Sequence, residues 1–494
     1  MRYKLPLLGT ATASLILVAG GAFASPGVTT RVSVSSTGAQ GNGGSGLPAI
    51  SADGRYVAFE SGASNLVTGD TNGKRDVFVH DRRTQATTRV SVDSAGLEGN
   101  GDSRYPAISA DGRYVAFSSS ASNLVRADTN DEQDIFLHDR QAGVTARVSV
   151  DSVGNQANGR SYDKPDISAD GRFVVFSSRA SNLVPNDTNT CVLYPADPGP
   201  CPDIFVHDRE TGETVRVSVD SEGHEANGQS FSSAVSADGR YVAFGSSATN
   251  LIPVDTNRDT DVFVHDRQTG KTTRVNVDSA GNQVDGNPWG VSLSISADGR
   301  YVAFGSEASN LAPADTNGWE DVFVHDRQLG QTRRVSVDST GAEGDRGSRM
   351  PVTSWDGRYV VFESYASNLA SMDTNGGVSD IFIHDLRSGE TTLVSVDSAG
   401  LQGNGGSGGH SAISSDGRYV AFVSSASNLV PGDTNECGNP PSTVNCHDVF
   451  VHERPRQSEA QPTPKTVALA GVAACGALLL VAGAWYARRR RQAG

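Results

Sequence analysis

A motif of oxygen-bearing side chains recurs along this chain. In its first copy, Asp70, Asn72 and Asp76 stand at offsets of 0, 2 and 6 residues. Hard cations such as Ca²⁺ bind several oxygens from carboxylates, amides and carbonyls, so one such loop could surround an ion. Further copies are Asp128, Asn130 and Asp134; Asp255, Asn257 and Asp261; Asp315, Asn317 and Asp321; and, one residue longer, Asp373, Asn375 and Asp380. The motif predicts structural calcium, because several near-equal copies argue against one catalytic metal.

A second interpretation of this motif needs no metal. Asp and Asn side chains stabilise turns by accepting hydrogen bonds from their own backbone. The position between Asn and the last Asp is acidic at Glu132 and Asp259 but not at Lys74 or Trp319. A third carboxylate is therefore not maintained, and both interpretations stay open at this point.

The histidines form a repeated set and an irregular set. Seven of the ten occupy one place in the pattern Asp-x-Phe-x-His: His80, His138, His207, His265, His325, His384 and His452. One copy in each repeat predicts a polar tie between neighbouring repeats rather than catalysis. A ligand site should break the repetition, and its candidates are irregular residues of the connecting loops: His224, Trp289, Arg349 and His410.

All these residues belong to one repeating unit. Ser-x-Asp-Gly-Arg begins at Ser51, Ser109, Ser168, Ser236, Ser296, Ser354 and Ser414. Asp-Gly is a strong signal for a tight turn between two strands, since glycine accepts a positive φ. In the second unit, residues 105–109, 114–118, 134–139 and 146–150 have the composition of four strands. Four antiparallel strands in about 60 residues make one blade of a β-propeller.

The ends of the repeat region predict how the ring closes. An Arg-Val-Ser-Val strand at Arg31 precedes the first Ser-x-Asp-Gly-Arg, whereas the seventh unit reaches Arg454 without such a strand. The amino-terminal strand can therefore complete the last blade, which removes the unpaired sheet edges that an open solenoid would keep. The expected fold is an all-β, seven-bladed propeller of four-stranded antiparallel blades, closed by the amino-terminal strand.

The unit Pro-Ala-Ile-Ser-Ala-Asp-Gly-Arg-Tyr-Val-Ala-Phe, followed by Asp-Val-Phe-Val-His-Asp-Arg, resembles the TolB-like or WD40-like β-propeller repeat. The resemblance covers roughly residues 28–454 and implies a propeller fold. TolB itself is similar only in part, because it has six blades, an extra amino-terminal domain and no carboxy-terminal anchor. The resemblance therefore implies nothing about a TolB-like role.

The two ends of the chain resemble targeting segments. A basic start, an apolar stretch and Ala-Phe-Ala favour a secretory signal, with an uncleaved anchor as the alternative. A charge-free apolar run before four arginines favours a span whose end is cytoplasmic. The predicted segments are 1–24 signal peptide, 28–454 propeller, 455–466 Pro/Gln-rich stalk, 467–487 transmembrane helix and 488–494 cytoplasmic basic tail. The expected location is the cell membrane, single-pass, with the propeller outside; whether the tail is cleaved stays open.

The cysteine pairs indicate the redox environment of the protein, and the net charge indicates which classes of partner it can bind. Cys191 with Cys201, and Cys437 with Cys446, form close pairs that an oxidising compartment would join as disulfides. Neither pair has the spacing of a zinc site. The formal charge of −15 disfavours nucleic-acid phosphates.

The sequence offers no catalytic constellation that stands out from the repeat. It contains no Gly-x-Ser-x-Gly nucleophile motif. The leading interpretation is a non-catalytic extracellular binding scaffold, not an enzyme, whose partner is a protein, a peptide or a wall polymer. The alternatives are a lyase-type enzyme acting on polysaccharide, or another propeller enzyme, with its site in the central channel, and a structural cell-surface protein.

Overall fold

The computed structural model describes residues 27–192, 198–285, 292–313, 315–371, 373–434, 436–437 and 444–455. The predicted signal peptide, nearly all of the stalk, the predicted span and the basic tail lie outside these residues. Within the described ranges, no helix is long and apolar enough to cross a membrane.

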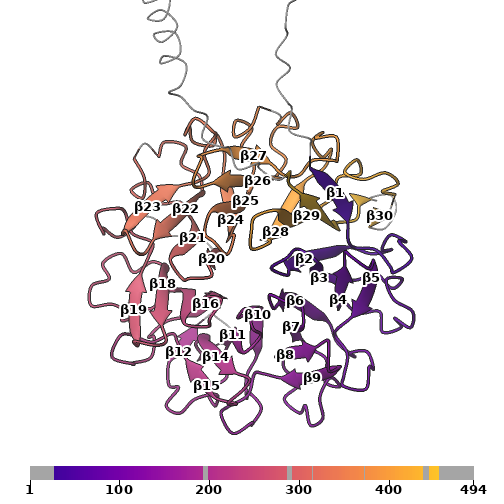
Figure 1. Cartoon of the computed structure of the whole chain (residues 1–494). Helices are drawn as coiled ribbons and strands as arrows, with labels where there is room; N and C mark the ends of the chain where they lie inside the picture. Colours follow the sequence, from indigo (N-terminus) through magenta and orange to yellow (C-terminus); the bar gives the residue numbers. More distant parts are fainter. Residues whose placement is uncertain are drawn as a thin grey trace, which may run out of the picture. The chain divides into compact units, whose positions relative to one another are not determined.

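Seven four-stranded antiparallel sheets stand around a central axis (Figure 1). Blades one to three are β2 (Ser45–Ile50), β3 (Tyr56–Ser61), β4 (Asp76–Asp81) and β5 (Ala86–Arg89); β6 (Ser103–Ile108), β7 (Tyr114–Ser119), β8 (Asp134–Asp139) and β9 (Val144–Arg147); and β10 (Ser161–Ile167), β11 (Phe173–Ser178), β14 (Asp203–Asp208) and β15 (Thr214–Arg216). Blades four to six are β16 (Ser230–Val235), β17 (Tyr241–Ser246), β18 (Asp261–Asp266) and β19 (Lys271–Arg274); β20 (Leu293–Ile295), β21 (Tyr301–Ser306), β22 (Asp321–Asp326) and β23 (Gln331–Arg334); and β24 (Ser348–Thr353), β25 (Tyr359–Ser364), β26 (Asp380–Asp385) and β27 (Thr391–Leu393). The number of blades and their strand order confirm the prediction.

The seventh blade joins the two ends of the ring. It consists of β28 (Ser407–Ile413), β29 (Tyr419–Ser424), β32 (Asp448–Glu453) and, as its outer strand, β1 (Val28–Arg31). β1 pairs antiparallel with β32, so that Arg31 faces Phe450, and the Val32 amide donates to the Val449 carbonyl at 2.8 Å. In Figure 1 the indigo β1 lies beside the orange and yellow strands of this blade. The predicted closure is confirmed.

The Ser-x-Asp-Gly-Arg motif shapes the first turn of each blade and links it to the neighbouring blades. In blade one, the Ser51 hydroxyl donates to Asp53, and the Arg55 guanidinium forms a bidentate pair with Asp81 at 2.7 and 3.0 Å. Gly54 has a φ of +72°, and a Cβ there would overlap the ring of Tyr419 in blade seven. Glycine is therefore needed both for the turn and for the approach of the previous blade.

Each blade contributes two stacked phenylalanines to the core. Phe59 and Phe78 of blade one lie 5.9 Å apart between ring centroids, and both are fully buried. The same pair recurs in every blade, and apolar side chains of adjacent blades pack around it. The hydrophobic core is therefore divided among the contacts between blades.

The repeated histidines are ties to the preceding blade, as predicted. The His80 imidazole Nδ1 lies 2.9 Å from the Thr87 hydroxyl, which donates to the Val34 carbonyl in the segment from the previous blade. The last blade uses the same arrangement with His452, Thr29 and Val396. Because burial lowers the pKa of His80 to about 4, the imidazole is neutral in the folded protein.

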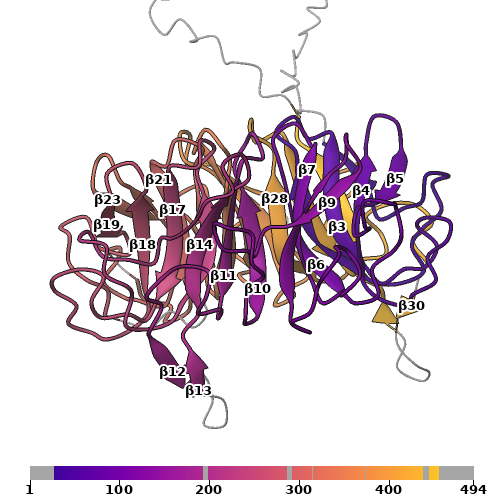
Figure 2. The same ribbon diagram turned by 90° about the horizontal axis from the view of Figure 1, so that it is seen from below.

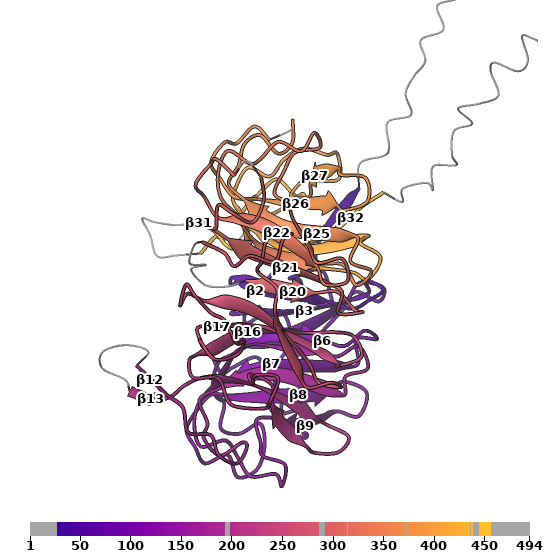
Figure 3. The same ribbon diagram turned by 90° about the vertical axis from the view of Figure 1, so that its left-hand side faces the viewer.

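Two insertions protrude from one face of the ring. The hairpin β12 (Thr190–Val192) with β13 (Pro198–Pro200), and the short pair β30 (Glu436–Cys437) with β31 (Val444–Asn445), project from the same side (Figures 2 and 3). We call this side the loop face; the Asp-Gly turns lie at the other ends of the strands. The predicted disulfide between Cys191 and Cys201 is present. Cys446 is also disulfide-bonded, while the side chain of Cys437 lies outside the described residues.

Candidate functional site

The predicted calcium residues lie in the loops before the third strands and, for the last aspartate, at the first residue of those strands. In blade one an arginine joins them. In blade one, Nη1 of Arg89 lies 3.6 Å from Asp70, 3.2 Å from Asp76 and 2.8 Å from Glu98. The Asn72 side-chain oxygen accepts the amide of Lys74 at 2.7 Å, which is the turn cap of the second interpretation. Arginines pair with both aspartates in the same way in every blade except blade six. A guanidinium thus already supplies positive charge to these carboxylates.

Only two groups of three carboxylates among the described residues are close enough to share an ion. They are Asp70, Asp76 and Glu98 in blade one, and Asp315, Asp321 and Glu343 in blade five. In both groups an arginine, Arg89 or Arg334, lies within ion-pair distance of all three. Calcium at the motif stays a prediction, and any ion in these two groups would have to share the carboxylates with a guanidinium.

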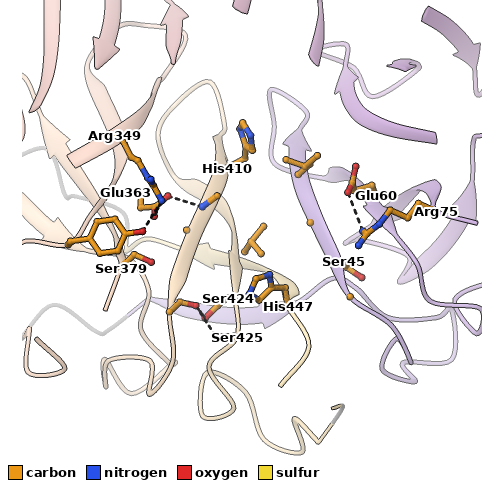
Figure 4. A pocket seen from close by; sticks show the side chains of 18 residues that line it. Ser45, Glu60, Arg75, Arg349, Glu363, Ser379, His410, Ser424, Ser425 and His447 are labelled. Carbon is orange, nitrogen blue, oxygen red and sulfur yellow. Dashed lines mark hydrogen bonds and ion pairs between the residues drawn. The ribbon is translucent and has the colours of Figure 1, made fainter. Parts of the chain in front are cut away.

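A pocket of about 620 Å³ opens on the loop face between blades six, seven and one (Figure 4). Its walls come from residues at and near the ends of strands in three blades. Blade six contributes Arg349, Glu363 and Tyr365, and blade one contributes Glu60 and Arg75. Blade seven forms the part between them, with His410 and His447.

The blade-six wall is a bonded cluster. Nη2 of Arg349 donates to Glu363 at 2.9 Å and to the Tyr365 hydroxyl at 2.8 Å. The other carboxylate oxygen of Glu363 accepts the Gly409 amide at 2.8 Å. Glu363 is buried, whereas the Arg349 side chain is 41% exposed, so the cluster presents its guanidinium to the pocket.

The blade-one wall repeats this charge pattern. Arg75 lies 3.2 Å from the buried carboxylate of Glu60, and the Tyr105 amide also donates to that carboxylate at 3.4 Å. Burial raises the pKa of Glu60. Each side of the pocket therefore carries a guanidinium held by a buried glutamate.

His410 lines the pocket without a hydrogen bond to its imidazole from any described residue. It comes from an enlarged β-bulge of β28 and is partly exposed. Burial, and to a smaller extent the charge of Lys164, lowers its pKa to about 4, so its imidazole is neutral near pH 7. Within the part of the chain that the structure describes, no hydrogen bond reaches this imidazole. A neutral imidazole of this kind can accept a proton from a bound molecule.

Glycine opens the blade-seven part of the pocket. A Cβ at Gly408 would come within 2.5 Å of the Glu363 side chain. The Gly-Ser-Gly-Gly-His run therefore lets the blade-six carboxylate approach the inner strand and leaves room beside it.

Of the four predicted ligand-face residues, the structure brings two together. Arg349 and His410 line the pocket. His224 lies instead in the loop between β15 and β16, where its side chain is 73% exposed and pairs with Asp220 at 2.9 Å. Trp289 lies outside the described residues.

Five of the lining residues were not selected from the sequence, and only two of them, Glu60 and Glu363, stand at a position that is mostly a small residue in the repeat. Glu60 and Glu363 follow the Phe of the second strand, where most other units have Ser or Gly. Arg75 and His447 immediately precede the first Asp of the third strand, and Tyr365 follows the second strand of blade six. For Glu60 and Glu363, an irregular residue at a strand end was therefore the usable signal, rather than an irregular loop residue.

Comparison with known proteins supports the fold. No family model and no curated protein matches the chain. An oligogalacturonate lyase in complex with manganese matches at 13% identity over 88% of this chain and 95% of that chain, with a TM-score of 0.51. An oligogalacturonate lyase from Vibrio parahaemolyticus matches at 12% identity over 86% and 93%, also at 0.51. TolB from Acinetobacter baumannii matches at 12% identity over 81% of both chains; its TM-score of 0.37 supports no further conclusion.

These neighbours correct the leading functional interpretation. Two enzymes have this architecture, so the fold gives no support to the prediction of a non-catalytic scaffold that is no enzyme, and it is compatible with the alternative of a lyase-type enzyme. The reasoning failed because it required a local catalytic motif. In a propeller, the groups around one pocket come from separate blades, and so leave no motif.

Proposed function

We propose that the protein is a lyase-type enzyme that cleaves a uronate-containing oligosaccharide in the loop-face pocket. The observation that supports this most directly is the place of His410, whose imidazole has no hydrogen bond among the described residues, in a pocket with a guanidinium on each side. The two structural neighbours are lyases of an acidic sugar chain, which agrees with the proposal.

Cleavage by elimination needs a base, a stabiliser of negative charge and a proton donor. His410 would take the proton from the carbon next to the sugar carboxylate. Arg349, whose side chain is 41% exposed and lines the pocket, would bind that carboxylate and stabilise the charge that develops on it. The carbon–oxygen bond at the next carbon then breaks, and His447 would return a proton to the leaving oxygen. A double bond forms and no water is consumed.

The residues of the pocket do not fit a bound manganese. Among the described side chains, no group of three metal-ligating residues includes His410 or His447. The proposal therefore assigns the neutralisation of the carboxylate to the guanidinium groups.

Product formation by the purified full-length protein tests this proposal. With polygalacturonate or another polyuronate as substrate, elimination gives an unsaturated uronate that absorbs in the ultraviolet. The variant His410→Ala should lose about 100-fold or more of the rate, as expected for removal of a general base. His224→Ala removes an exposed histidine outside the pocket and should leave the rate unchanged. Equal rates for wild type and His410→Ala, or no product from any polyuronate, would refute the proposal.

Membership of the TolB-like superfamily, and export with a membrane anchor, are parts of the same proposal. The repeat sequence supports the first. The disulfide between Cys191 and Cys201 is compatible with an oxidising compartment and so supports the second.

A further inference from the structure

The inner strands of blades three and seven differ by one residue from those of blades one, two, four and six. In blades one, two, four and six, the inner strand carries one extra residue relative to the second strand, as between Gly46 and Ala49. In blade three, the pairing jumps from Tyr162 to Asp166, which leaves two extra residues. In blade seven the jump is from Ser407 to Ser411. Lys164 and His410 lie in these two larger bulges.

The bulge of blade three places Lys164 on the central channel. A cavity of about 180 Å³ runs between the inner strands of all seven blades, with room for several water molecules. Its lining is mostly Ala, Ile, Val and Ser. Among the described residues that line it, Lys164 is the only lysine or arginine and Asp166 the only carboxylate. The same ammonium contributes to the lowered pKa of His410, which places the two bulges within electrostatic reach of each other.

The charge of Lys164 is not neutralised by a direct ion pair. Within the described ranges, no carboxylate lies within 4.0 Å of its ammonium. Asp166, which follows on the same strand, accepts the Val235 amide at 2.8 Å and the Ile167 amide at 2.9 Å. Asp166 thus ties blade three to blade four, and burial lowers the pKa of Lys164 in spite of it.

One large side chain interrupts the floor of the channel. The second residue of Ser-x-Asp-Gly-Arg is Ala in five blades and Ser in blade seven, but it is Trp355 in blade six. Backbone hydrogen bonds join these positions from blade to blade, for example from the Ala297 amide to the Trp355 carbonyl at 3.0 Å. Trp355 lines the same cavity as Lys164. Trp355 is the only aromatic residue among the described residues that line this cavity.

We propose that the channel is a separate binding site for one small carboxylate ligand of the acidic-sugar class, with Lys164 holding the carboxylate and Trp355 contacting the ring. The ammonium of Lys164, which has no carboxylate within 4.0 Å among the described residues, supplies the affinity for the anion. A bound carboxylate would favour the charged form that burial disfavours. The class of ligand rests on the proposed function; the site itself rests on the channel.

Titration of the full-length protein with galacturonate, followed by calorimetry, tests the site without any turnover. Galactose, which has the same ring without the carboxylate, is the matched neutral probe. Galacturonate should bind, and galactose should bind at least about tenfold more weakly, since tenfold corresponds to about 1.4 kcal/mol. Lys164→Met should abolish this preference, and Lys164→Arg should retain part of it.

Two further variants identify where the ligand binds. Lys271→Met changes an exposed lysine of β19 and should leave the affinity unaltered. Trp355→Ala should weaken the binding of both probes. Equal affinity for the two sugars, or full affinity in Lys164→Met, would overturn the proposal.

The two proposals can fail separately. Galacturonate binding that depends on Lys164, with no cleavage of any polyuronate, would support the channel site and refute the lyase. Cleavage that depends on His410, together with galacturonate binding that is unchanged in Lys164→Met, would support the lyase and refute the channel site.

Discussion

Blades one and six both carry the Asp-Thr-Asn motif before the third strand, but they compensate the negative charges of its carboxylates differently. In blade one, the Arg89 guanidinium lies among Asp70, Asp76 and Glu98. In blade six, Leu393 stands where the other blades have arginine.

In blade six, side-chain amide groups take the place of the missing arginine only in part. Nε2 of Gln402 donates to Asp373 at 2.9 Å and to Asp380 at 2.8 Å. The Asn375 side-chain oxygen is buried and has no hydrogen-bond partner among the described residues. Burial, together with the nearby Asp373, raises the pKa of Asp380 to about 6.

The difference shows what the arginine does in the other blades. A buried carboxylate costs free energy unless a charge or several donors compensate it. The glutamate of blade one is Gln402 in blade six, but glutamine also stands beside an arginine in blades two, four and seven, as Gln156, Gln283 and Gln40. Among the described residues, blade six therefore keeps two acids without the positive partner that an arginine supplies in the other blades.

The largest expected effect comes from making blade one like blade six. Arg89→Leu leaves three carboxylates around an apolar side chain, and should lower the free energy of unfolding by about 3–5 kcal/mol. Chemical denaturation measures the loss. Arg126→Leu changes an exposed arginine and should stay within about 0.5 kcal/mol of wild type. Equal effects of the two variants would mean that the central guanidinium has no special role.

The reciprocal change, Leu393→Arg, should stabilise the protein by about 1–2 kcal/mol near neutral pH. The raised pKa of Asp380 means that the folded state binds its proton more tightly than the unfolded state does. Protonation of Asp380 therefore stabilises the folded state. This stabilisation is complete below the pKa that Asp380 has in the unfolded chain, and it disappears as the pH rises through about 6. The gain from the arginine should thus be large above that pH and small in acid. A gain independent of pH would contradict this account.

The smallest effect concerns the calcium predicted from the sequence. Blade six has its sharpest test, because there no arginine competes for the carboxylates. Calcium at a concentration near its Kd would stabilise the protein by only about 0.4 kcal/mol, which a thermal melt with and without chelator can resolve. Leu393→Arg should remove the shift. If calcium leaves the melting temperature of wild type unaltered, the calcium prediction is wrong.

Much of the fold was predictable because its signals are local or repeated. The Asp-Gly turn, as at Gly54, predicts a hairpin. The extra strand at Arg31, before the first complete unit, predicts that the ring closes through its two ends. The repeated histidines, such as His80, were recognisable as ties for the same reason. An interaction that recurs in each unit has to be compatible with the fold of every unit.

The candidate site was predictable only in fragments. Arg349 and His410 were found as irregular residues, but His224 was chosen by the same criterion and lies elsewhere. Nothing in the chain relates Arg75 to His447, because blades one and seven lie at opposite ends of the repeat region and meet only in the closed ring.

The amino-acid sequence by itself determined the seven units, the four strands of each unit and the joining of the ends, because turn chemistry and alternation act between near neighbours in the chain. Only the tertiary structure decided which irregular residues share a pocket, which carboxylates meet an arginine and where Lys164 lies. Those outcomes depend on distances across the ring and on small shifts of strand register, and neither is set by spacing along the chain.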